Sequence, residues 1–133
     1  MITEELVVDT TGRVLTDLTA ELTAFCAGRG DGLAHAFCPH ATAALVLMEM
    51  GAGSDRDLEV WLEANLPHQD RYHHRHGALG HGADHLLPAL LGSAVSVPVR
   101  AGRPGLGTWQ SLVLVDTNRD NRRRRVVLSF LPG

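Results

Sequence analysis

The chain has 133 residues, a formal net charge of −3 at pH 7, 44% hydrophobic residues and 20% charged residues. This length is typical of one domain, so we expect residues 1–133 to fold as a single domain that buries its own core. The weakly negative charge excludes the overall positive field that draws proteins to nucleic acid. No apolar segment reaches the roughly 20 residues that a membrane span needs, and no secretion leader is recognisable, so we expect a cytoplasmic protein without a membrane partner.

The first half of the chain alternates between strand and helix patterns. The β-branched segment "EELVVDT" predicts a first strand. Apolar residues then recur at helical spacing, at Leu15, Leu18, Leu22 and Phe25, and Gly28 is expected to stop that helix.

The next segment, "GLAHAFCPHATAALVLMEM", is apolar but contains a proline near its middle. Because a central proline argues against one unbroken strand, we expect a strand to about Cys38, a kink, and a second strand from about Thr42 to Met48. Ser54 and Asp57 fit a capping box that opens a helix over "DRDLEVWLEANL".

The second half ends in a run of strands. "ADHLLPALLG" predicts a short helix interrupted by Pro88, and "SAVSVPVRAG", "LGTWQSLVLVDT" and "RRRRVVLSFL" predict three successive strands. Early alternation followed by successive strands indicates an α+β fold with mostly antiparallel pairing. Cys26 and Cys38 lie in apolar segments and are expected to be buried free thiols.

Histidines are concentrated in residues 71–92, "RYHHRHGALGHGADHLLPALLG", which contain five of the eight in the chain. Three imidazoles plus water make an open, catalytic type of metal site, because neutral imidazole is the commonest protein metal ligand. The chain has no HExxH or CxxC motif, so such a site must be assembled from separated segments. The alternative is a polar surface loop, or separate histidines bonded to the backbone.

Four further features carry candidate chemistry, each with a structural alternative. Glu49 ends an apolar run, where a buried carboxylate needs a partner, or it faces water. Asp57 serves either the site or the helix cap. Trp109 is expected in the core, and Gln110 points the other way and needs partners if it is buried. The basic run "RDNRRRR" is either a solvated hairpin end or an anion site, since arginine binds phosphate through two hydrogen bonds.

These segments together resemble the YjbQ-like family, small proteins often described as secondary thiamine-phosphate synthases. The resemblance covers nearly the whole chain and rests on seven segments in the family's order: "HATAALVLME", "RDL", "LPHQDRYHH", "DHLLPALLG", "VPVRAG", "LGTWQ" and "RRRRVVL". "LGTWQ" together with three ordered histidines is specific, whereas any single segment is weak.

Matched position by position, the resemblance implies a site whose residues come from the whole chain. The expected metal ligands are His40, His74 and His85, with zinc the first expectation. Glu49 or Asp57 would act as a general base or orient a ligand histidine. The resemblance leaves His73, His76 and His81 as loop residues outside the site. Expected substrate contacts are Thr42, Arg100, Thr108, Trp109 and Gln110, with an arginine of the Arg122–Arg125 run as a further phosphate ligand.

The resemblance also implies an α+β fold with a β-sandwich-like core, and a homotrimer with sites near subunit boundaries. The expected function is a metal-dependent reaction on a small phosphorylated metabolite, with thiamine-phosphate synthase activity as one form of it. The chain is shorter than the roughly 200-residue TIM barrel expected of an ordinary thiamine-phosphate synthase. Two alternatives stay open: hydrolysis of a small phosphorylated metabolite, and a non-catalytic module that binds a metal or an anion.

The chain departs from the family pattern at several positions near the expected site. Ala41 replaces the first threonine after His40, Met48 replaces the asparagine before the glutamate, and Leu87 replaces the lysine that follows the third histidine. A "GAGS" loop stands where the family has Asp-Pro. These departures concern substrate binding more than they concern the three histidines.

Overall fold

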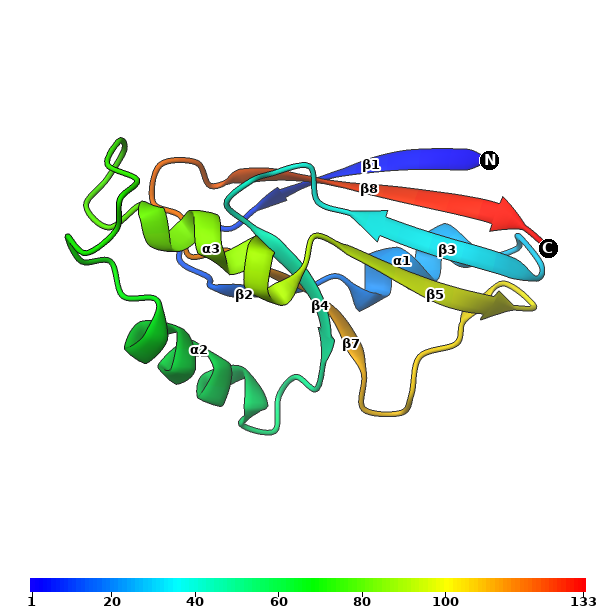
Figure 1. Cartoon of the computed structure of the whole chain (residues 1–133). Coiled ribbons are helices and arrows are strands. Elements are labelled where there is room, and N and C mark those ends of the chain that lie inside the picture. Colours follow the sequence, from blue (N-terminus) through cyan, green and yellow to red (C-terminus); the bar gives the residue numbers. More distant parts are fainter.

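The computed structural model describes all 133 residues of the chain as three helices and eight strands (Figure 1). In chain order, the elements are β1 (Ile2–Asp9), β2 (Leu15–Asp17), α1 (Thr19–Cys26), β3 (Gly32–Phe37), β4 (Ala44–Met48), α2 (Ser54–Asn65), α3 (Gly82–Leu91), β5 (Ala94–Arg100), β6 (Arg103–Pro104), β7 (Ser111–Val115) and β8 (Arg123–Pro132). The strands form a five-stranded sheet, β1-β8-β3-β5-β6, and a three-stranded sheet, β2-β7-β4, with antiparallel pairing throughout. None of the three helices is both long and apolar enough to cross a membrane.

The main core lies between the two sheets and is closed by α1. It includes Val126, Leu128 and Phe130 from the large sheet, Leu112 and Leu114 from the small one, and further apolar residues of α1. A second, smaller core covers the opposite face of the small sheet, where α2 and α3 pack (Figure 1). Strand β7 is therefore buried on both faces, which explains its unbroken apolar sequence "LVLV". The α+β prediction is confirmed.

Strand β8 connects the architecture because it pairs with β1 on one side and β3 on the other. Its side chains alternate as the strand period requires: residues 124, 126, 128 and 130 are buried, while Arg123 and Arg125 are exposed. The predicted kink after Cys38 is also found, since β3 ends at Phe37 and β4 begins at Ala44.

The helix predicted from Leu15 onward is shorter than its periodicity indicated. Leu15 belongs instead to β2 and pairs with Val115 of β7. The helix begins only at Thr19, whose backbone N–H donates to Oδ1 of Asp17 at 2.9 Å. An aspartate that accepts from the residue two positions on favours a turn over continued helix, so it separates β2 from α1.

Two predictions about helix ends and breaks also differ from the structure. Ser54 is the first residue of α2 rather than its cap, which is Gly53, so the Ser54–Asp57 capping box does not form. Helix α3 continues through Pro88, which removes one hydrogen bond to the carbonyl of residue 84 but leaves the neighbouring Leu87 packed in the second core.

The segment Leu106–Gln110 is a loop, although the sequence predicted a strand. Trp109 is 74% exposed there instead of lying in the core. Oε1 of Gln110 accepts the backbone N–H of Gly107 at 2.8 Å and so stabilises a tight turn just before β7. Strand β7 therefore begins only at Ser111.

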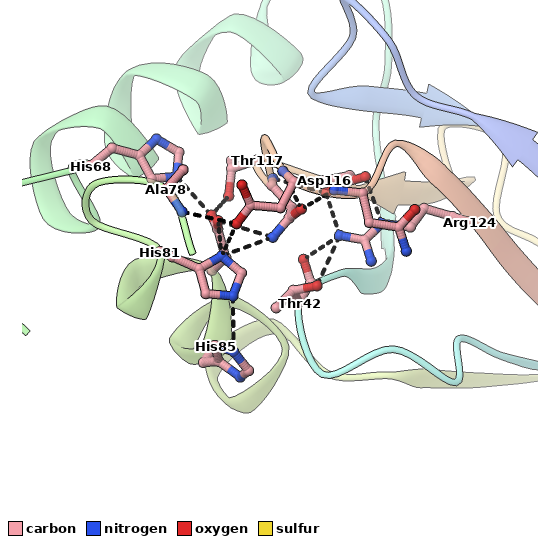
Figure 2. Close-up of polar contacts among 12 residues, drawn as sticks. Thr42, His68, Ala78, His81, His85, Asp116, Thr117 and Arg124 are labelled. Atoms are coloured by element: carbon pink, nitrogen blue, oxygen red, sulfur yellow. Dashed lines mark hydrogen bonds and ion pairs between the residues drawn. The ribbon is translucent and has the colours of Figure 1, made fainter. Parts of the chain in front are cut away.

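One arginine of the basic run is buried and is not available to an anion, whereas its neighbours Arg123 and Arg125 are exposed. Arg124 is only 1% exposed and forms a two-pronged ion pair with Asp116, at 2.8 Å from Nε to Oδ2 and 3.0 Å from Nη2 to Oδ1. Nη2 also donates to Oγ1 of Thr42 at 2.9 Å (Figure 2). The inward-facing arginine of this run thus belongs to the core.

We expect Arg124→Met to lower the free energy of unfolding by about 3–5 kcal/mol, because it leaves the Asp116 carboxylate buried without a counter-charge. Urea denaturation followed by circular dichroism would measure the change. Arg125→Met is the matched control, since Arg125 is exposed on the same strand and its pair with Glu5 is a surface one. A loss for Arg124→Met no greater than that of the control would contradict the expectation.

We expect both cysteines to resist thiol reagents in the folded protein. Cys26 and Cys38 are buried and unpaired, and burial raises the pKa of both thiols, that of Cys38 to about 11. Because the thiolate is the reactive form, a disulfide reagent at pH 8 should titrate neither thiol in buffer and both in denaturant. Reaction of either thiol before unfolding would contradict the expectation.

Candidate metal centre

Three histidines meet where the loop of residues 66–81 runs into α3. His81 immediately precedes α3 and His85 lies one turn later, so the i, i+4 spacing puts both imidazoles on the same face. His74 reaches them from the loop, with its ring centroid 4.2 Å from that of His85. One ring nitrogen from each of the three lies within 4.8 Å of the others, so these side chains could hold one metal ion.

The distances suit nitrogen ligands on a common ion. Nε2 of His81 lies 3.2 Å from Nε2 of His85 (Figure 2). Two nitrogens bound to a tetrahedral zinc at about 2.0–2.1 Å would lie about 3.3 Å apart. In addition, Nδ1 of His74 is buried and has no hydrogen-bond partner. A buried ring nitrogen without a partner is costly, and a metal ion would satisfy it. The donor set therefore fits zinc.

Burial and neighbouring imidazoles keep two of these rings neutral. For His74, burial lowers the pKa below its ordinary value, and the positive charge of protonated His76 and His81 lowers it further. The same causes lower the pKa of His85, opposed by the carboxylate of Asp84. Neutral imidazole is the form that binds metal, so these rings are ready to act as ligands at neutral pH.

Acidic residues around His81 select one of its two neutral forms. Nδ1 of His81 lies 3.1 Å from Oδ2 of Asp120, 3.4 Å from Oδ2 of Asp84 and 3.2 Å from Nδ2 of Asn118. Two carboxylate oxygens facing one ring nitrogen favour a proton on that nitrogen over acceptance of a hydrogen bond from the Asn118 amide. This proton assignment leaves the lone pair on Nε2, the nitrogen that faces His85.

Asp84 is 1% exposed and is held by three donors besides His81. Its Oδ1 faces Nε2 of His68 at 2.8 Å and accepts from Oγ1 of Thr117 at 2.8 Å, while its Oδ2 accepts from Nδ2 of Asn118 at 3.2 Å. Oδ1 of Asn118 in turn accepts two backbone N–H groups at 2.7 and 2.8 Å, which fixes the direction of its amide. The arrangement is the carboxylate–histidine support that metal sites use to orient a ligand.

A cavity of about 350 Å³ opens beside the cluster, and its walls include His74, Arg75 and His76. Arg75 forms an exposed ion pair with Asp70, which also lines the cavity. A guanidinium in this position supplies the positive charge that an anionic ligand would need next to the histidines.

The structure brings together two of the three expected ligands and places a further histidine beside them. His74 and His85 lie in the cluster as expected, whereas His81, which we expected to be a bystander in the loop, is 8% exposed and lies between His85 and the carboxylates. The i, i+4 spacing of His81 and His85 is the sequence signal that would have found it. His73 is exposed and outside the group of three, as expected.

His40 takes a different position and is not part of this cluster. Its Nε2 accepts the backbone N–H of Arg125 at 2.9 Å. Burial lowers the pKa of His40, and the nearby Arg124 and Arg125 lower it further, so this ring is a neutral acceptor. Thr42, expected to contact substrate, accepts from Arg124 through its hydroxyl.

The remaining expected site residues lie away from the histidine cluster within one folded chain. Glu49 directly follows β4 and Gln110 directly precedes β7, and the pairing of Met48 with Ser111 sets these two side by side. Figure 1 places that end of the small sheet and the start of α2, where Asp57 lies, away from the start of α3. Arg100, at the end of β5, is likewise far from the histidines (Figure 1). Thr108 and Trp109 belong to the exposed loop that leads into β7.

Known proteins resemble this chain over its whole length. A UPF0047 protein of Mycobacterium tuberculosis is 56% identical over 133 residues and covers all of both chains. A UPF0047 protein of Archaeoglobus fulgidus is 36% identical over 125 residues, which cover 92% of this chain and 97% of that one. The crystal structure of a hypothetical protein from Aeropyrum pernix K1 matches with a TM-score of 0.88, 27% identity and full coverage of both chains.

A family model also matches this chain. The family model described as "UPF0047 protein YjbQ-like" matches residues 4–133, nearly the entire chain. The proteins of Mycobacterium tuberculosis and Archaeoglobus fulgidus carry that family name, and the Aeropyrum pernix structure shares the arrangement of sheets and helices. The chain therefore belongs to the YjbQ-like, UPF0047 family.

Proposed function

We propose that this protein binds one divalent metal ion, zinc by preference, through His74, His81 and His85, and uses it in a reaction on a small phosphorylated metabolite. The observation that carries the proposal is the pair of Nε2 atoms of His81 and His85, 3.2 Å apart, with carboxylates behind His81. Histidine ligands favour zinc over the harder ions Mg²⁺ and Ca²⁺. The partnerless Nδ1 of His74 supports the same assignment.

The chain's own residues have separate roles in this proposal. When bound, the metal would supply Lewis acidity toward a phosphoryl oxygen or a water molecule. His81 is oriented by Asp84 and Asp120, so its ligating nitrogen keeps its direction. Arg75, in the wall of the adjacent cavity, would bind the phosphate in place of Asp70.

The size of the cavity bears on which reaction class is favoured. About 350 Å³ is near the lower limit for small-molecule sites, which suits one small phosphorylated molecule better than two substrates. Within one chain, hydrolysis is therefore favoured over the thiamine-phosphate synthase reaction, which joins a pyrimidine diphosphate to a thiazole phosphate and releases pyrophosphate. Zinc-loaded protein can be incubated with the pyrimidine diphosphate and the thiazole phosphate together. The synthase reaction would yield thiamine phosphate and pyrophosphate, whereas hydrolysis would yield no thiamine phosphate. Tight phosphate binding without turnover would indicate a binding module instead.

We further propose that the protein is a homotrimer and that its complete site forms between copies. Nothing in the single chain covers the outer face of the large sheet, where Val7, Leu33, Phe37 and Leu131 are each more than 40% exposed. Exposed apolar patches of this kind mark association surfaces. Association through a closed ring could bring Trp109, Gln110 and Glu49 of one copy toward the histidines of another, which a single chain does not do.

We expect metal affinity to depend on the three clustered histidines and not on their neighbour. His81→Ala should lower the affinity for zinc by at least about 100-fold, because it removes both a ligand and the target of its supporting carboxylates. His85→Ala and His74→Ala should have comparable effects. Competition with a chromophoric chelator, together with elemental analysis of protein prepared without a histidine tag, would measure the affinities.

The matched control for these substitutions is His73→Ala, because His73 is exposed, adjacent to His74 and outside the cluster. It should bind zinc as the unaltered protein does. Equal zinc affinity in His73→Ala and His81→Ala, or the absence of stoichiometric zinc in the unaltered protein, would refute the metal site. A His40→Ala variant tests separately whether His40 is a metal ligand, as the family resemblance implied.

We expect light scattering to give three times the mass of one chain at micromolar concentration. Phe37→Glu places a charge on the outer face of the large sheet and should shift the protein to monomers. Val60→Glu, an equally drastic change at a half-exposed position of α2, serves as the control. A stable monomer for the unaltered protein would rule out the trimer.

A further inference from the structure

We propose that His76 is an exchangeable fourth ligand of the metal, which closes the site at rest and is displaced when an anionic ligand enters the adjacent cavity. This inference rests on the metal site proposed above and deepens it by naming what controls access to the ion. The family resemblance gave His76 no role, and it is not among the three histidines whose nitrogens lie mutually within 4.8 Å.

The first observation is the position of the His76 ring relative to the other three. Its centroid lies 4.0 Å from that of His74, 5.4 Å from that of His81 and 6.1 Å from that of His85. The other three rings are 4.2, 4.9 and 5.4 Å apart. Four imidazoles on a tetrahedral zinc with bonds of about 2.0–2.1 Å would have centroids about 5.2 Å apart. The six distances scatter around that value, so the His76 ring is close enough for a change of side-chain rotamer to bring one of its nitrogens to the ion.

The second observation is that His76 lacks the support that fixes His81 and His85. His81 is 8% exposed and faces two carboxylates, and His85 is anchored on helix α3. His76 is exposed, belongs to a loop, and is followed by Gly77 in a left-handed conformation with φ +80°. None of the hydrogen bonds in the structure engages its ring. A ligand without outer support is held less firmly, so its exchange costs less than that of His81 or His85.

The third observation is where the exchange would take place. His76 lines the same cavity of about 350 Å³ as Arg75 and His74. An anion in that cavity would meet the guanidinium of Arg75 and approach the ion from the side of His76. Zinc sites with four protein ligands are typically structural, and those with three and an open position are typically catalytic. Movement of one exposed side chain would thus convert the first type into the second.

The test uses the full-length protein loaded with Co²⁺, whose visible absorption reports the ligands directly. His76→Ala should still bind one Co²⁺ per chain but with a changed visible spectrum. Inorganic phosphate should then bind His76→Ala about ten-fold more tightly than the unaltered protein, if His76 occupies its position nine-tenths of the time. Saturating phosphate should also shift the spectrum of the unaltered protein toward that of phosphate-bound His76→Ala.

The control is His73→Ala, which removes an exposed histidine of the same loop without approaching the cluster. It should match the unaltered protein in both spectrum and phosphate affinity. Identical spectra and phosphate affinities for His76→Ala and the unaltered protein would overturn the role of His76 while leaving the three-histidine site intact. Failure of the unaltered protein to bind Co²⁺ at all would overturn the proposed metal site and this inference with it, so the two failures are distinguishable.

Discussion

The ion pair between Arg124 and Asp116 holds the two sheets in register. Arg124 projects inward from β8 of the large sheet, and Asp116 directly follows β7 of the small one. Burying two charges is expensive unless every oxygen is satisfied. Here both carboxylate oxygens accept from the guanidinium, Oδ2 also accepts from Thr10 at 2.6 Å, and Oδ1 accepts the backbone N–H of Asn118 at 2.9 Å. The separation of the sheets is therefore fixed by directional bonds as well as by apolar packing.

The same network continues into the metal centre. Asn118 is joined to Asp116 through its backbone N–H and to Asp84 through its side-chain amide, and Asp84 faces Nδ1 of His81. The amide has only one orientation that satisfies these partners, because its oxygen already accepts two backbone N–H groups. Asp84, which Asn118 holds, in turn orients the His81 ring, so the buried segment that spaces the sheets also supports this ring. A substitution of Asp116 would therefore disturb the orientation of His81 although Asp116 does not contact that ring.

Local sequence patterns predicted the structural features that depend on residues close in the sequence. They missed the features that depend on partners far away in the sequence. The alternation in β8 and the kink between β3 and β4 follow from the strand period and from Pro39. The burial of Arg124 could not be read in this way, because its partner Asp116 belongs to the other sheet. Trp109 was misplaced because the turn held by Gly107 and Gln110 interrupts an apolar pattern. The resemblance supplied His74 and His85 but passed over His81, which helical spacing alone would have paired with His85.

Loop residues 66–81 carry two of the three clustered histidines, and glycines explain how this irregular segment reaches α3. A Cβ on Gly80 would come within 2.3 Å of the carbonyl carbon of His68, and one on Gly82 within 2.5 Å of Cβ of Tyr72. Only glycine permits both close approaches, which fold the loop back onto the start of the helix. The hydroxyl of Tyr72 completes the fold by donating to the carbonyl of Pro67 at 2.8 Å. Close contacts within the loop, rather than regular secondary structure, thus position His74 next to His85. Because few apolar side chains bury this loop, metal binding would contribute to ordering it, and ligand affinity and loop stability become linked quantities.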